Sequence, residues 1–246
     1  MLDISNLPID PDEIINSLKR DIQLRQISQK LLYRRVVEQT ATERNIIVTP
    51  EEIQAEVDRV RHEMRLEKAS DTLTWLASQM ITPEDWEAGI RDRLLGKKLS
   101  EFLFSQEVEK FFAQNRLNYE QVLLYQIIIN DEKIAQELFY QIEEQEISFY
   151  EAAHFYDIDE ERRRRCGYGG KLYRRQLAPD IASAVFGASL GELIGPLNIE
   201  PGYRLLMVEE FIPAELTTEI HQEIINRMFR EWLESECNYL IHNQII

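Results

Sequence analysis

The distribution of glycine divides this chain into two kinds of sequence. Seven of its nine glycines lie between Gly167 and Gly202, and the rest of the 246 residues is almost free of glycine. Glycine serves where the backbone takes a positive φ or passes close to another group. A chain that confines its glycines to one window, with helical periodicity elsewhere, is expected to combine a helical part with a second part built from strands and tight turns.

The composition is that of a globular chain with an excess of acid. It is 44% hydrophobic and 29% charged, with a formal net charge of −16, which disfavours nucleic acid and anionic membranes as partners. No apolar run approaches the roughly 20 residues that span a bilayer. Residues 1–14 are acidic and lack the basic and apolar regions of a secretory signal, so we expect a cytoplasmic protein with no membrane partner.

The first half carries repeated helix-start signals. Residues 10–13, 49–52 and 82–85 each place Asp or Thr before a proline, followed by acidic residues. The Asp or Thr oxygen can accept from a free N–H, proline fits the first helical position, and the acids favour the positive end of the helix dipole. Apolar residues then recur at intervals of three and four. This pattern predicts a bundle of about four or five amphipathic helices over residues 12–115.

The pattern changes after residue 120. Residues 121–129 are β-branched and aromatic, which predicts a buried strand. The further elements predicted in this region are helices over 131–143, 148–156 and 179–187, and strands over 193–197 and 203–208. A basic loop precedes Gly169-Gly170, and a turn at 200–202 separates the last two strands. Strands and helices in this order indicate an α+β layer.

A last helix begins at Thr218 and has the character of the first half, with Ile220, Ile224 and Trp232 on one face. We expect it to pack back onto the N-terminal helices. The predicted fold class is therefore α+β, with an N-terminal helical bundle completed by the C-terminal helix and an α+β domain inserted between them. The expected domains are residues 1–116, 117–213 and 214–246.

The inserted part contains an ordered set of short motifs. They are Leu124 to Ile129, Gly169-Gly170-Lys171-Leu172, Leu177-Ala178-Pro179-Asp180-Ile181, Phe186, the Gly-Glu-Leu-Ile-Gly-Pro of 191–196, and Gly202-Tyr203-Arg204. In this order and spacing, residues 119–212 resemble the parvulin-type peptidyl-prolyl cis-trans isomerase domain. The flanking helices resemble the helical chaperone module of SurA-like proteins. The resemblance implies isomerase activity on Xaa-Pro bonds, no cofactor, and a proline-containing peptide or unfolded protein as the client.

The resemblance also assigns residues to the site. It implies an apolar proline pocket made by Leu172, Leu177, Ile181 and Phe186. Parvulins commonly place histidines where this chain has Gln126 and Arg204, and an acid or thiol at the position of Asp159. The candidate catalytic positions are therefore Asp159, Gln126 and Arg204. Asp159 is alternatively a solvated loop carboxylate, since Asp is common in such loops.

Prolyl isomerisation breaks no covalent bond, which leaves two functions open. The barrier is rotation about a partly double C–N bond, roughly 18–20 kcal/mol, and an apolar pocket that favours the twisted amide over either planar form lowers it. Loss of both histidines leaves either a weak isomerase or a peptide binder without isomerase activity, such as a chaperone or an accessory protein of maturation or export. A third alternative is a structural subunit whose groove is filled by a partner helix, so the oligomeric state stays open.

Basic residues lie close to the implied pocket in sequence. Arg162–Arg165 are followed by Lys171, Arg174 and Arg175, and no acid lies between 162 and 175. One interpretation is a rim, with Arg164 and Arg165 as substrate-binding residues, that selects acidic or phosphorylated peptides, since Arg binds carboxylate and phosphate in a bidentate manner. The other is a solvated loop that balances the acids at 157–161.

The remaining chemistry-bearing residues show no pattern of a second site. Cys166 follows the arginines, but no histidine stands at a family position to act as its base, and the histidines show no metal-ligand spacing, so we expect no metal site. Cys166 and Cys237 are expected to be reduced thiols. We expect Trp75, Trp86 and Trp232 to be core or groove-lining residues. SurA-like proteins imply a groove between the N-terminal helices and the C-terminal helix for apolar peptide.

Overall fold

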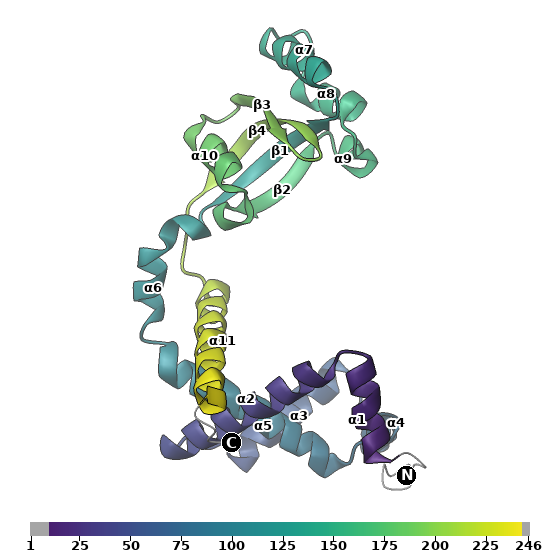
Figure 1. Cartoon of the computed structure of the whole chain (residues 1–246), viewed down its shortest axis with the longest axis vertical. Coiled ribbons are helices and arrows are strands. Elements are labelled where there is room, and N and C mark those ends of the chain that lie inside the picture. The colour runs from purple at the N-terminus through teal and green to yellow at the C-terminus, as the bar shows by residue number, and fades with distance from the viewer. Residues whose placement is uncertain (1–9, 243–246) are drawn as a thin grey trace. The chain divides into compact units, whose positions relative to one another are not determined.

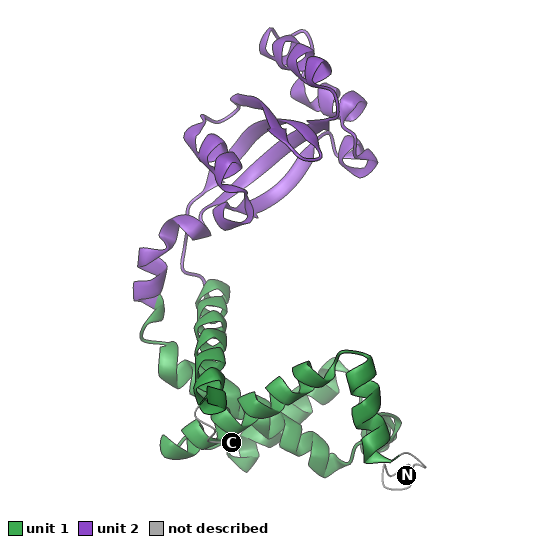
Figure 2. Cartoon of the chain, in the orientation of Figure 1, with its two compact units in different colours: residues 1–108, 218–246 green, residues 109–217 purple. Residues whose placement is uncertain are grey.

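The chain forms two compact units, and one is inserted into the other. The computed structural model describes residues 10–242. Unit 1 comprises the described residues up to Val108 and from Thr218 onward, and unit 2 is Glu109–Thr217 (Figure 2). The insertion confirms the predicted fold class. The units divide after residues 108 and 217, whereas the expected domains divide after residues 116 and 213. The segment read for a secretory signal, residues 1–14, falls largely outside the described residues, so cytoplasmic residence stays a prediction.

Unit 1 is entirely helical in the part of the chain that the structure describes. Its helices are α1 (Pro11–Arg20), α2 (Leu24–Glu43), α3 (Pro50–Glu63), α4 (Ala69–Ser78), α5 (Pro83–Phe104) and α11 (Thr218–His242), with α6 (Val108–Gln114) starting at its border (Figure 1). Among residues 10–242, none of these helices is long and apolar enough to cross a bilayer.

The three predicted helix starts are present. Asp10, Thr49 and Thr82 are the N-caps of α1, α3 and α5, and each side chain accepts a hydrogen bond from a backbone N–H of the first turn. In α3 and α5 the side chain of the acidic residue three positions later accepts a hydrogen bond from the backbone N–H of the N-cap residue, which completes a capping box. The chain is nevertheless divided into more helices than the periodicity predicted.

The additional helix ends are made without glycine. Ile22, Asn45, Arg65 and Met80 have φ between 55° and 59° and follow the C-terminal residues of α1, α2, α3 and α4. Each end carries the paired bonds of a Schellman motif; after α3, for example, Leu66 N donates to Arg61 O and Arg65 N to His62 O, at 2.8 and 3.1 Å. Helix ends that lack the usual glycine leave no local signal in the sequence.

The core of unit 1 joins segments from both ends of the chain. Val37 of α2, Leu99 of α5 and Leu233 and Cys237 of α11 belong to one buried cluster. A second cluster packs Leu76 of α4 with residues of α5 that include Trp86, whose ring lies 5.7 Å from that of Trp75. The C-terminal helix therefore completes the N-terminal bundle, as predicted, and α5 contributes to both clusters. Trp86 is a core residue of the second cluster and Trp75 packs at its edge, as Trp232 packs at the edge of the first.

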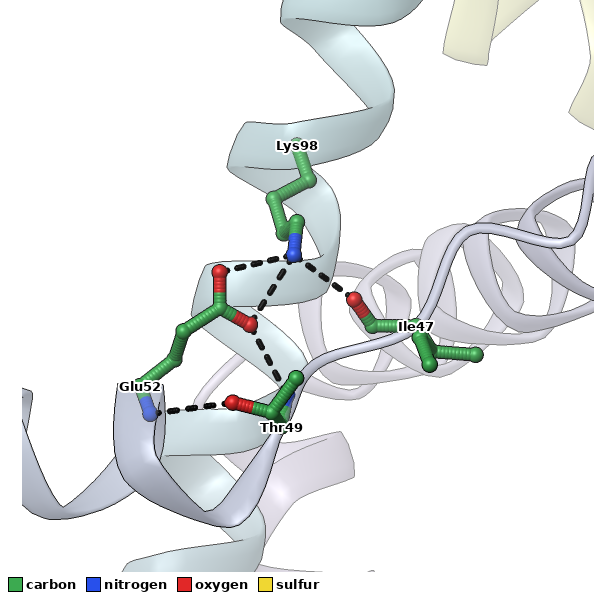
Figure 3. Close-up of polar contacts among 4 residues, drawn as sticks. All are labelled: Ile47, Thr49, Glu52 and Lys98. Carbon is green, nitrogen blue, oxygen red and sulfur yellow. Dashed lines mark hydrogen bonds and ion pairs between the residues drawn. The ribbon is translucent and has the colours of Figure 1, made fainter.

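A lysine of α5 holds the start of α3 in place. Lys98 Nζ donates to both carboxylate oxygens of Glu52, at 2.7 and 2.9 Å, and to the carbonyl of Ile47 at 2.8 Å (Figure 3). The same carboxylate accepts from Thr49 N at 2.8 Å, as part of the capping box. The bonds from Lys98 and from the Thr49 N–H hold the pKa of the Glu52 carboxyl below its ordinary value.

Glu52→Gln is expected to lower the thermal unfolding midpoint at pH 7. Because the folded-state pKa of Glu52 lies below its unfolded value, its contribution is complete above the ordinary carboxyl pKa, about 4.3, and is lost as the pH falls through the folded pKa. The gap in midpoint between the wild type and the variant should therefore shrink between pH 6 and acidic pH. Glu87→Gln, which removes the same charge at an exposed position of α5, is the control, and an equal loss in both variants would count against the network.

Arg65→Gly is expected to stabilise the protein by about 1 kcal/mol, because a left-handed conformation costs an L-residue about 1–2 kcal/mol and glycine returns only part of this as lost backbone freedom. The Arg65 side chain is exposed, so little packing is lost. Arg65→Ala removes the same side chain but keeps Cβ, and should show no gain. Denaturant unfolding measures both variants, and an equal effect of Gly and Ala would refute the conformational explanation.

Unit 2 is a four-stranded antiparallel sheet with helices on both faces (Figure 1). The strands are β1 (Gln121–Ile129), β2 (Tyr168–Tyr173), β3 (Leu193–Ile199) and β4 (Gly202–Ile212), in the order β2-β1-β4-β3. The helices are α7 (Glu132–Glu143), α8 (Phe149–Tyr156), α9 (Glu160–Arg164) and α10 (Pro179–Gly187), with 3₁₀ turns η2 (Arg116–Tyr119) and η3 (Arg174–Gln176).

Alternation along the two central strands separates two cores. Ile127 and Leu205 point to the face covered by α7 and α8, where they pack with Leu138 and Phe149. Residues of the opposite parity, Val122, Leu124, Leu206 and Val208, pack with Ile181 and Val185 of α10 on the other face. The α10 face is the one that carries the candidate site.

Two glycines of the sequence window act through close approach. A Cβ at Gly169 would lie 2.9 Å from the carbonyl oxygen of Leu124 on the neighbouring strand, and one at Gly195, where φ is +125°, would lie 2.5 Å from the carbonyl of Arg204. Both contacts are shorter than a real Cβ tolerates. The segment before Gly169, predicted as a basic loop, instead forms α9 and leads into β2, a strand whose two glycines obscured it.

Candidate functional site

A cavity of about 280 Å³ opens between the sheet and α10. Strands β1 and β4 form its floor, and β2, η3 and the start of α10 form its wall. The residues that line it are Leu124, Gln126, Leu172, Gln176, Leu177, Ala178, Ile181, Ile199, Arg204 and Leu206. The cavity is apolar except for two glutamines and one arginine.

The cavity brings together most of the residues that the sequence singled out. Gln126 is paired with Leu206 across β1 and β4, and Arg204 with Ile128, so the two polar side chains lie on one face, two positions apart in register. Leu172, Leu177 and Ile181 lie around them. Leu124 and Leu206 were missed, although they share the parity of Gln126 and Arg204 and a strict alternation of side chains would have found them.

Arg204 is incompletely hydrogen-bonded. Its Nη2 lies 3.4 Å from the carbonyl oxygen of Glu200, a long contact, and its Nε is shielded from solvent and has no hydrogen-bond partner. Buried polar groups are paired in the great majority of cases. The Arg204 guanidinium therefore has hydrogen-bond donors that the protein around it does not use.

Asp159, the third candidate catalytic residue, is not among the residues that line the cavity. It is the N-cap of α9, and its Oδ1 accepts from Arg162 N at 2.8 Å. That bond, and the charge of Arg162, hold the pKa of the Asp159 carboxyl below its ordinary value. The geometry favours the alternative that Asp159 is an exposed loop carboxylate with a capping role.

The buried acid of this loop is Asp157. Its side chain is fully buried and accepts from Arg162 Nε and Nη2, at 2.6 and 2.7 Å. It also accepts from the backbone N–H of Asp159 at 2.8 Å, and a longer bond of 3.4 Å comes from Ile128 on β1. Asp157 therefore anchors the loop between α8 and α9 to the first strand, a role that depends on tertiary placement and has no sequence signal.

The arginines proposed as a substrate rim are occupied elsewhere. Arg164 pairs with Glu160 and Arg165 with Glu161, both at 2.6 Å on the exposed surface of α9. Neither lines the cavity. Such exposed pairs one turn apart on a helix are what a solvated, charge-balanced segment produces, which is the second interpretation of the basic run.

Phe186 lies beside a different hollow. It lines a second cavity of about 460 Å³ with Phe211 and Arg174, among others. The Arg174 guanidinium stacks 4.6 Å from the centre of its ring and pairs with Glu120 at 2.9 Å. Phe186 sits later on α10 than Ile181, so it projects toward the far end of β4 rather than over Gln126 and Arg204.

Arg162→Gln is expected to destabilise unit 2 by about 3–5 kcal/mol, because it leaves the buried Asp157 carboxylate without its partner. Arg164→Gln and Arg165→Gln remove the same charge from exposed pairs and should change the free energy of unfolding by about 1 kcal/mol or less. Urea unfolding of the three variants measures the difference, and equal losses would contradict the assignment of Arg162 to a structural role.

The comparison with protein families identifies this unit. Residues 130–210 match the sequence model of the Rotamase family, described as the PPIC-type PPIASE domain. The inserted unit is a parvulin-type rotamase domain. The match begins after β1 and covers most of β4 and the segments that carry most of the cavity wall. The resemblance drawn from the short motifs is confirmed.

The whole chain is similar to foldases. It is 24% identical over 240 residues to the foldase protein PrsA of Halalkalibacterium halodurans, covering 94% of this chain and 71% of that protein. It is 23% identical over 208 residues to foldase protein PrsA of Caldanaerobacter subterraneus subsp. tengcongensis, covering 84% of this chain and 62% of that protein. The crystal structure of PrsA from Bacillus cereus superposes with a TM-score of 0.53 at 16% identity, over 97% of this chain and 89% of that one, which shows the shared fold.

Proposed function

We propose that the cavity between the sheet and α10 binds the proline of an Xaa-Pro segment, and that the domain isomerises this bond weakly in peptides or unfolded proteins. The observation that carries the proposal is the lining itself. Leu172, Leu177 and Ile181 form an apolar wall in the cavity that the polar side chains of Gln126 and Arg204 also line. The match of residues 130–210 to the rotamase domain supports the reaction type.

The weakness of the proposed activity follows from the polar floor. Rate gain comes only from contacts that are stronger in the twisted amide than in either planar form. An apolar wall that holds the proline ring contacts the twisted amide and both planar forms alike. Preference for the twisted form therefore depends on the groups beside the amide. Here those groups are Gln126 and Arg204, in place of the two histidines that the family resemblance implied at these positions.

Gln126→His/Arg204→His is expected to accelerate isomerisation on the order of tenfold over the wild type, which corresponds to about 1.4 kcal/mol of transition-state stabilisation. Exchange NMR or a protease-coupled assay on a set of Xaa-Pro peptides measures both proteins. Leu177→Glu places a charge in the apolar wall and should abolish acceleration in either background. No acceleration by the folded wild type or by the double variant would refute the enzyme proposal.

A non-catalytic peptide-binding function is the second candidate. The observation that favours it is that Asp159 lies on the surface of α9 and does not line the cavity. The acid or thiol that the family resemblance implied is therefore not beside the amide. Binding of proline peptides without acceleration, lost in Leu177→Glu, is the result that would select this candidate over the isomerase.

We also propose that unit 1 contacts unfolded clients, as the similarity to foldases suggests. A cavity of about 510 Å³ lies between α2 and α11, where Leu32, Tyr33 and Ile241 meet the polar side chains of Arg25 and Glu234. Its position corresponds to the groove expected between the N-terminal helices and the C-terminal helix. Suppression of the aggregation of a denatured client by the intact chain, measured by light scattering, tests this role.

A further inference from the structure

The candidate proline cavity contains a positive charge that its own walls do not balance. Among the described residues that line it, Arg204 is charged and no carboxylate is present. The other polar groups are the neutral amides of Gln126 and Gln176, and the rest of the wall is apolar. A cavity of this kind is complementary to a small ligand that carries both an apolar part and a negative charge.

In the described part of the chain, four other arginines of this unit are paired with carboxylates, which Arg204 is not. Arg162 bonds a buried carboxylate at 2.6 Å, Arg164 and Arg165 bond exposed ones at 2.6 Å, and Arg174 bonds Glu120 at 2.9 Å. Arg204 has one contact of 3.4 Å, to a backbone carbonyl, and an Nε with no partner. Its hydrogen-bonding capacity is therefore available to a ligand at little loss of protein contacts.

The backbone of Arg204 is held in the interior of the sheet. Arg204 pairs with Ile128 of β1 on one side and Leu197 of β3 on the other, so it stands within the sheet rather than at an edge. The carbonyl oxygen of Arg204 is also approached by Gly195, where no Cβ would fit. Arg204 lines the same cavity as Leu177 and Ile181 of the apolar wall.

We propose that Arg204 makes the cavity selective for a proline that is adjacent to a carboxylate. This inference rests on the proposed function, because it concerns which peptides the same cavity accepts. Two sources supply the chemistry, an acidic residue next to an internal proline and the free carboxylate of a C-terminal proline. Charge-assisted bonds from guanidinium to carboxylate are roughly twice as strong as bonds between neutral groups. Selection for acid thus moves from Arg164 and Arg165, where the sequence suggested it, to the inside of the cavity.

Peptide pairs that differ only in charge test the proposal on the intact chain. The first pair is blocked at both ends and contains Glu-Pro or Gln-Pro; the second ends in Ala-Pro with a free carboxylate or an amide. Titration calorimetry should give about tenfold tighter binding, a difference of about 1.4 kcal/mol, for the charged member of at least one pair. The pair that shows it identifies the source. The preference should weaken with added salt.

Variants of Arg204 test whether this residue causes the preference for charged peptides. Arg204→Gln should reduce the ratio of affinities within the selected pair to about one, and Arg204→Lys, which keeps the charge but not the fork of donors, should retain part of it. Arg116→Gln removes the same charge from an exposed position of η2 and should leave the ratio unchanged. If Arg204→Gln does not fold, as judged by circular dichroism, the wild-type ratios and Arg204→Lys decide.

The outcomes distinguish failure of this inference from failure of the proposed function on which it rests. Equal binding of charged and neutral peptides by the wild type would overturn the inference and leave the proposed function standing. A preference that survives Arg204→Gln, or that is lost equally in Arg116→Gln, would also overturn it. Failure to bind any of the four peptides would overturn both.

Discussion

The pairing of β1 with β4 is the constraint on which the rest of unit 2 depends. These strands are neighbours at the centre of the sheet although they are the first and last of the unit, and their register runs from Gln121 opposite Ile212 to Ile129 opposite Tyr203. That register places Gln126 and Arg204 on one face. It also places the start of β1 opposite the end of β4. One antiparallel ladder thus determines both the floor of the candidate site and the ability of the unit to be inserted into a helical domain.

Arginine illustrates how tertiary partners, and not residue type, determine function in this domain. Arg162 neutralises a buried carboxylate and has a structural role. Arg164 and Arg165 form ion pairs with glutamates on the exposed surface. Arg204, distant from them in sequence, is the arginine that lines the cavity. A contiguous basic run attracts notice in a sequence, but three of its four arginines are paired with carboxylates. Among the described residues, it is the isolated Arg204 within a strand that has a buried nitrogen without a hydrogen-bond partner.

The sequence was informative where physical causes are local and uninformative where they are not. Helix starts at Thr49 and Thr82 were predictable because a cap, a proline and an acid act within one turn. Helix ends at Ile22 and Met80 were not, because these residues adopt left-handed φ values that only the bonds of the folded chain stabilise. The cavity residues Gln126 and Arg204 followed from motif order. The burial of Asp157 depends on a partner five residues away and a strand far along the chain, which no local pattern records.

The inserted arrangement has a consequence for the order in which the protein is made. The buried cluster of unit 1 needs Leu233 and Cys237 of α11, which leave the ribosome after all of residues 109–217, at about 5–20 residues per second. The buried cluster of the helical unit therefore stays incomplete while the sheet unit is synthesised and can fold. Once β1 and β4 pair, Gln121 lies opposite Ile212, and the cost of closing a long loop has been met within the insertion. The newly made C-terminal helix then completes a core whose other helices are already tethered close by.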